Sequence, residues 1–196
     1  LALGLLALGL LAFLPNQLHT LDNRDGHRFA RYLAALAIEL KTEDGPRIEA
    51  VLPYANKTLL SYAERAAAQD LSVFGTPLLR DAGTEIGDVA TKRGRDDCPG
   101  AVDAVTPLGE ESRYAKVEGW VLVPALADNL ALVRFIDADG RIAGFALSGV
   151  WRPDVAAALG TPKKHAGFSG YILKSAANGP FSYGARGGGC EAVYAP

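Results

Sequence analysis

The chain has 196 residues, enough for one domain of ordinary size or for one domain with an appendage. It is 49% hydrophobic and 21% charged, which excludes wholesale disorder and a collagen-like structure. The net charge of −2 gives no electrostatic footprint for nucleic acid, so we expect no nucleic-acid partner. The chain begins at Leu1 and contains no Met, so we expect a processed product or a fragment.

An apolar run opens the chain. Residues 1–14 comprise eight Leu, three Ala, two Gly and one Phe, and the first charged side chain is Asp22. A helix of this length spans about 21 Å, short of the roughly 30 Å hydrocarbon core. The run has no polar face. It also lacks the basic residues that precede the apolar stretch of a signal peptide. We predict that residues 1–21 are a single membrane anchor or the end of a transmembrane helix, in contact with membrane lipid. The alternatives are an uncleaved signal-anchor and a buried soluble helix.

Residues 22–90 have the pattern of a helical connector. One helix is expected over residues 24–42, where apolar residues recur at spacings of four, three and four: Phe29, Leu33, Leu36 and Leu40. Gly45-Pro46 is a stop signal for that helix. We expect this helix and a second connector helix, described next, to pack on each other and on the membrane surface.

A second helix is expected over residues 54–69. Its inward-facing residues are predicted to be Leu59, Leu60, Ala63 and Ala67. A short extended segment, residues 70–74, and a loop-rich linker marked by Gly75, Pro77 and Gly83 complete the connector.

The pattern changes to short strands after Cys98. Strands are predicted over residues 116–123, 130–136, 141–147, 168–173, 181–183 and 190–194. Asp137-Ala138-Asp139-Gly140 is a hairpin signal, and residues 152–159 form a short helix with Pro153 at its first position. We therefore predict an α+β fold: an N-terminal membrane helix, a helical connector, and an immunoglobulin-like antiparallel β-sandwich over residues 91–196.

Cys98 and Cys190 bracket this carboxyl half. Two Cys allow one pairing only, and the further ligands that a metal site requires do not lie near them in the sequence. Together with a membrane-linked amino end, they predict a disulfide formed in an oxidising compartment. The alternative is two buried free thiols in a cytosolic domain.

The sequence offers no catalytic, cofactor-binding or metal-binding set. The Asp137-x-Asp139-Gly140 stretch lacks the other ligands of a calcium loop, and Gly187-Gly188-Gly189 follows no strand-to-helix transition. His165 stands without a nucleophile signature. Four aromatic residues are either core residues or a platform for a glycan or a protein partner: Trp120, Trp151, Tyr171 and Tyr183.

Two stretches resemble a group of known proteins. Residues 48–74 resemble the segment after the last transmembrane helix of bacterial polytopic envelope proteins, some of which are assigned as membrane glycosyltransferases. Residues 98–190 resemble the extracytoplasmic module that ends some of them. The matching motifs include Cys98-x-Gly100-x-x-Asp103, Glu118-Gly119-Trp120, Arg152-Pro153-Asp154-Val155 and Ala166-Gly167-Phe168-x-Gly170-Tyr171.

The resemblance implies a compact β-sandwich module on the periplasmic side of the bacterial inner membrane. Catalytic carboxylates of such transferases lie in loops between transmembrane helices that this chain lacks, so no catalytic residue is carried over. For the Arg152-Pro153-Asp154 motif the resemblance implies a structural role, which we predict to be an Arg–Asp pair or a helix cap.

Three functions are open. We favour a non-catalytic, membrane-anchored periplasmic module that docks on a larger membrane complex, with other membrane-protein subunits as partners. The alternative is a carbohydrate-binding tail domain that serves envelope-polysaccharide synthesis. An enzyme would require a pocket that gathers His165 with carboxylates such as Asp154 or Asp103.

Overall fold

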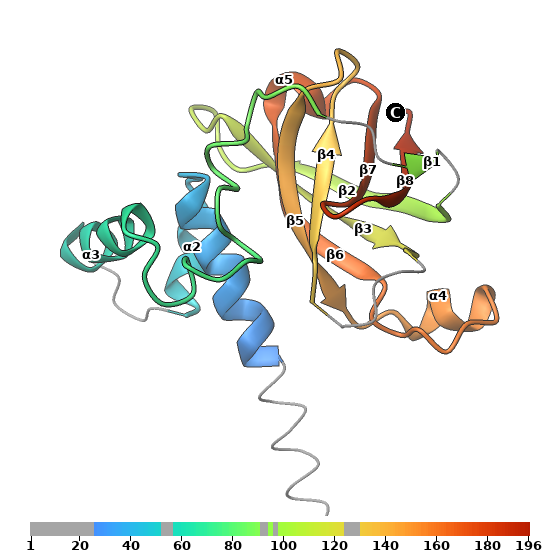
Figure 1. Ribbon diagram of the computed structural model, residues 1–196, viewed down its shortest axis with the longest axis horizontal. Helices are drawn as coiled ribbons and strands as arrows, with labels where there is room; N and C mark the ends of the chain where they lie inside the picture. The colour runs from blue at the N-terminus through green and yellow to red at the C-terminus, as the bar shows by residue number, and fades with distance from the viewer. Residues whose placement is uncertain (1–25, 52–56, 91–93, 96–97, 124–129) are drawn as a thin grey trace, which may run out of the picture.

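The computed structural model describes residues 26–51, 57–90, 94–95, 98–123 and 130–196. Helices and turns from the first part of the chain pack against one face of a curled β-sheet (Figure 1). No helix in this described part is long and apolar enough to cross a membrane. The predicted membrane segment, residues 1–21, lies outside the described residues.

The two long helices of the connector lie where the sequence predicts them. One covers residues 26–39, and α3 covers Lys57–Ala68. The predicted stripe faces the core, because Leu33, Leu36 and Leu40 are buried.

A short helix, α2 (Gly45–Glu49), was not predicted. Asp44 caps it, since the Oδ1 of Asp44 accepts a hydrogen bond of 3.2 Å from the backbone N–H of Arg47. Pro46 lies in its first turn, where a missing N–H costs little. Gly45-Pro46 therefore begins a second helix as well as following the first.

The predicted extended segment at residues 70–74 is wrong. The chain forms turns there, with positive φ angles at Asp70 and Ser72, and Phe74 is buried. A Cβ on Gly75 would lie 2.0 Å from the Asp70 carbonyl oxygen, so this tight turn requires glycine. Turns continue to residue 87, as the glycines and proline of the predicted linker indicate.

The eight strands of the described residues belong to one sheet. In chain order they are β1 (Gly94–Arg95), β2 (Gly100–Pro107), β3 (Tyr114–Val121), β4 (Leu132–Ile136), β5 (Ile142–Val150), β6 (Gly167–Leu173), β7 (Phe181–Ala185) and β8 (Gly189–Tyr194). The spatial order is β1-β8-β7-β4-β5-β6-β3-β2, and every pair is antiparallel except β1 with β8. Two further helices, α4 (Pro153–Ala158) and α5 (Lys174–Ala177), flank β6.

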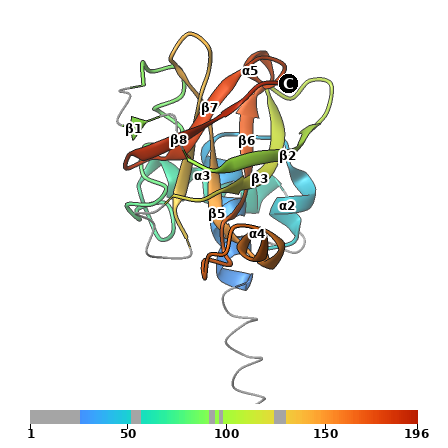
Figure 2. The same ribbon diagram turned by 90° about the vertical axis from the view of Figure 1, so that its right-hand side faces the viewer.

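The sheet curls until β2 comes into contact with β8 (Figure 2). The register shifts are bulges, with one extra residue in β2 (Asp103) and two in β5 (Ala143 and Gly149), and bulges increase local twist and bend. The α+β class and the antiparallel sheet are confirmed. The packing is sandwich-like, but it comes from one continuous curled sheet rather than from the two separate sheets of an immunoglobulin-like domain.

The sheet has a core on each face. The inner core lies inside the curl and contains the rings of Phe135, Phe168, Phe181 and Tyr183, with neighbouring ring centroids 5.5–6.2 Å apart. The outer core lies between the helices and the convex face. It joins connector residues such as Leu36 and Leu79 to strand residues such as Phe145, Leu147 and Tyr171.

Candidate functional site: an ion-paired patch beside helix α4

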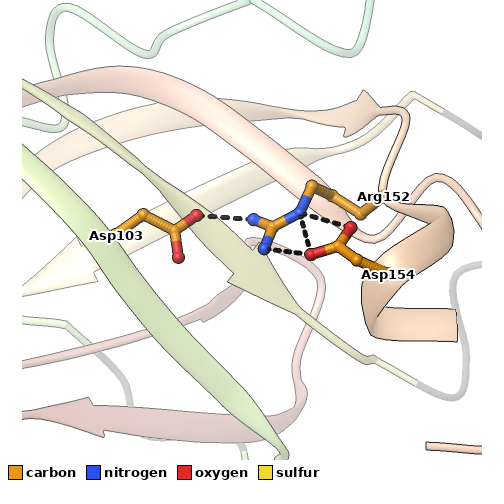
Figure 3. Close-up of polar contacts among 3 residues, drawn as sticks. All are labelled: Asp103, Arg152 and Asp154. Atoms are coloured by element: carbon orange, nitrogen blue, oxygen red, sulfur yellow. Dashed lines mark hydrogen bonds and ion pairs between the residues drawn. The ribbon is translucent and has the colours of Figure 1, made fainter. Parts of the chain in front are cut away.

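Three side chains from two sequence motifs meet beside α4 (Figure 3). The Arg152 guanidinium donates from Nε to Asp154 Oδ1 at 3.0 Å and from Nη2 to Asp154 Oδ2 at 2.8 Å. Its Nη1 donates to Asp103 Oδ2 at 2.5 Å. The predicted Arg152–Asp154 pair is confirmed. The alternative, a helix cap made by a side chain, is not found: Arg152 occupies the N-cap position of α4, but its side chain makes no capping hydrogen bond.

Local structure sets each member of this triad in place. Asp103 lies at the bulge of β2, and Asp154 lies in the first turn of α4. The backbone N–H of Arg152 donates to the Lys164 carbonyl at 2.6 Å. A Cβ on Gly167 would lie 2.8 Å from Arg152 Cγ, so the glycine leaves room for the arginine stem over β6.

The triad is a fixed ionic group at neutral pH. The Arg152 hydrogen bonds lower the pKa of the Asp154 carboxyl to about 2. Hydrogen bonds to Asp154, which contribute most, and to Asp103 raise the pKa of the Arg152 guanidinium. Asp154 therefore stays ionised, and its lone pairs are directed at Arg152 rather than at a substrate proton.

An exposed indole stands next to this triad. Trp151 is 54% exposed. Its ring centroid lies 4.8 Å from the His165 ring in an edge contact, and Lys164 Nζ lies 5.5 Å from it. His165 Nδ1 is 3.1 Å from the Gly149 carbonyl oxygen. We call Asp103, Trp151, Arg152, Asp154, Lys164 and His165 the α4 patch.

The four aromatic residues named as glycan or partner contacts divide into two pairs. Trp151 is exposed, and Trp120 is half-buried on β3, paired with Gly167 of β6. Tyr171 and Tyr183 are each only 1% exposed, so they are core residues and not contacts. Both faces of their strands are covered by a hydrophobic core. An alternating sequence pattern therefore cannot tell which side chains of these strands are exposed.

Tyr171 joins the connector to the sheet. Its hydroxyl donates to Asp44 Oδ2 at 2.8 Å in a buried setting, and burial raises the pKa of the hydroxyl so that it stays protonated. Burial likewise raises the pKa of Tyr183 to about 12, with the Asp103 carboxylate adding to the shift. Sequence reasoning missed Asp44, although an Asp before Gly-Pro is a recognised helix-start signal.

The disulfide between Cys98 and Cys190 is confirmed, with the two Cα atoms 5.2 Å apart. It lies at the inner core, between the segment before β2 and β8. Within the described residues, no group of three or more His, Cys, Asp or Glu side chains could hold a metal ion.

The three residues considered for acid–base chemistry, Asp103, Asp154 and His165, each contact a protein group other than one another. Arg152 engages Asp103 and Asp154, and His165 contacts Trp151 and the Gly149 carbonyl. What the patch offers is a rigid surface with one exposed aromatic ring and a fixed charge pair. No protein-family model, curated protein or solved structure matches this chain.

Proposed function

We propose that this chain is a non-catalytic, membrane-anchored accessory module that docks on a larger membrane protein complex through the α4 patch. The observation that carries the proposal is the exposed Trp151 ring, held in place beside an arginine that is itself fixed by two carboxylates. Tryptophan and arginine dominate the energetics of protein interfaces, above all where they are rigid before binding.

The proposed location is the bacterial inner membrane, with the β-domain in the periplasm. The disulfide is compatible with an oxidising compartment. The apolar run of residues 1–14 supplies the proposed contact with lipid.

Site-specific photocrosslinking in a bacterial host tests the docking. A photoreactive amino acid replaces Trp151 in the full chain, and the matched control replaces Val193, which is also well exposed but lies on β8. We expect membrane-protein adducts from position 151 and not from position 193. Arg152→Gln in the position-151 background should weaken the adducts. A chain that stays monomeric in mild detergent and gives the same adducts at both positions would refute the proposal.

Carbohydrate binding is the second candidate. It is favoured by the same exposed Trp151, since an exposed indole can stack on sugar rings, and by the adjacent Arg152–Asp154 pair, which offers polar groups for hydroxyls. NMR titration with envelope oligosaccharides distinguishes it. Shifts centred on the Trp151 indole N–H that are lost in Trp151→Ala would favour this function over protein docking.

A further inference from the structure

A second site lies in the helical layer, away from the α4 patch. A hollow of about 640 Å³ opens between the helix of residues 26–39, α3 and the turns of residues 72–76. We call it the helical hollow. Its volume lies in the range of small-molecule binding pockets.

The walls of the helical hollow are largely apolar. Small side chains line it from both helices, at Ala34 and Ala35 on one and at Ala63 and Ala66 on the other, and the buried side chains of Ile38 and Phe74 complete the apolar wall. The alanines of the two facing helices fill little of the space between them. A groove of this kind fits a slender hydrocarbon chain.

One end of the helical hollow is cationic. Arg28 and Arg31 line it, both are exposed, and Arg28 lies over the Tyr32 ring at 5.8 Å. Among the described lining residues there is no Asp or Glu. The charge therefore favours a ligand with an anionic group at one end and an apolar body.

The position of the arginines suggests where such a ligand comes from. Arg28 and Arg31 lie in the first two turns of the helix of residues 26–39, the part nearest in sequence to the apolar run that ends at Leu14. The 14 residue steps from Leu14 to Arg28 reach at most about 50 Å even when fully extended. An anchor at residues 1–14 would therefore hold Arg28 within about 50 Å of the bilayer and Arg31 within about 60 Å.

We propose that the helical hollow takes one acyl chain of an anionic membrane phospholipid, with the lipid phosphate paired to Arg28 and Arg31. The inference rests on the proposed membrane anchor. The uncharged run of residues 1–14 would leave the two guanidinium groups without an anion, so it is a poorer occupant than the lipid. Lipid in the hollow would fix the connector, and with it the β-domain, at the membrane surface.

Photoactivatable lipid tests the site in the full chain. The chain is reconstituted in phosphatidylcholine vesicles that contain phosphatidylglycerol with a photoreactive acyl chain, and crosslinked peptides are mapped by mass spectrometry. We expect adducts in the peptides that contain Ile38 and Phe74. A photoreactive phosphatidylcholine probe should give about tenfold fewer, because it lacks the net negative charge.

Two pairs of variants make the assay specific. Ala66→Phe fills the hollow and should abolish these adducts, whereas Ala68→Phe, on the exposed face of the same helix, should leave them unchanged. Arg28→Gln with Arg31→Gln should reduce them about tenfold. The control, Arg65→Gln with Arg113→Gln, removes the same charge from exposed residues outside the hollow and should have no effect.

Flotation of the vesicles distinguishes failure of the proposed anchor from failure of the proposed lipid site. A chain that does not float with vesicles refutes the proposed anchor. A chain that floats but gives adducts only in residues 1–14, or equal adducts from both lipid probes, refutes the lipid site alone. Adducts that Ala66→Phe leaves unchanged, or crosslinks between two copies of the chain through the hollow, refute it as well.

Discussion

The inner and outer cores lie on opposite faces of the same sheet, and they draw on different parts of the chain. The described residues of the inner core come from residues 98–194, and the Cys98–Cys190 disulfide closes it. The outer core takes one wall from connector residues 33–90 and the other from the sheet. The inner core can therefore form from the β-domain alone, whereas the outer core requires the sheet as a template.

This difference predicts an asymmetry. Damage to the inner core should release the connector too, while damage to the outer core should loosen the connector and leave the sheet folded. Two signals separate the regions, because both Trp residues lie in the β-domain and, among the described residues, the longest helices lie in the connector. Tryptophan fluorescence reports on the former, and helical circular dichroism is dominated by the latter.

Phe135→Ala is expected to have the largest effect. Phe135 is fully buried at the centre of the inner core and contacts the rings of Phe168, Phe181 and Tyr183. Its truncation should lower the free energy of unfolding by about 3–5 kcal/mol in urea titrations. Fluorescence and circular dichroism should shift together.

Leu71→Ala is the control for this substitution, because Leu71 is half exposed in the connector, and its effect should be small. A Phe135→Ala chain whose helical signal keeps the wild-type midpoint would show that the outer core stands without the sheet.

Loss of the disulfide should come next. The bond closes a loop across 92 positions, and the chain-entropy model gives such a loop roughly 4–5 kcal/mol, while measured effects fall nearer 2–4 kcal/mol. Cys98→Ser with Cys190→Ser should lower both unfolding midpoints under non-reducing conditions. Adding reductant should bring the wild type to the same stability and leave the variant unchanged. A wild type that reductant does not affect would contradict the assignment of this bond as a structural one.

Tyr171→Phe acts on the outer core through a single hydrogen bond. The change leaves the buried Asp44 Oδ2 without the donor at 2.8 Å, which should cost about 1–3 kcal/mol. We expect the helical midpoint to fall more than the fluorescence midpoint, and amide exchange in residues 33–40 to accelerate. Tyr62→Phe, an exposed tyrosine on α3, is the matched control. Equal shifts in both signals would mean that the two cores unfold as one unit.

Local sequence patterns predicted most elements but not how they meet. The stripe through Leu33, Leu36 and Leu40 located the first helix, and alternation together with turn signals located β3 to β8 within about three residues. Alternation failed at β2, where the bulge at Asp103 breaks the period. Bulges and close glycine contacts also set the curl, and neither has a strong sequence signature.

The site was predicted only where its partners are neighbours in sequence. Arg152 and Asp154 are two positions apart, so their pairing was readable from the motif. Asp103 is 49 positions from Arg152, and Asp44 is 127 from Tyr171. Strand order and register create those contacts, so a single sequence did not reveal them. The sequence left Tyr171 and Tyr183 as either core or platform residues, and the structure shows that both are core residues.

The smallest effect concerns acid stability at the α4 patch, which lies outside both cores. The folded-state pKa of Asp154 is lowered to about 2, below its ordinary value of 3.8. Its stabilising contribution is therefore fully present above pH 3.8, and it is lost as the pH falls from there to about 2. Asp154→Asn should flatten this part of the pH dependence of the unfolding free energy, measured by urea titration.

Arg152→Gln should flatten it at least as much, since it removes the partner of both Asp154 and Asp103, and the double variant should add nothing beyond Arg152→Gln. The absence of any added effect of Asp154→Asn in the Arg152→Gln background identifies the part that belongs to this ion pair. Acid limbs that superimpose for wild type and variants would show that Arg152 and Asp154 are not paired in solution. In that case Asp103 alone would hold Arg152, and the guanidinium edge that faces Asp154 would be open to a partner's carboxylate.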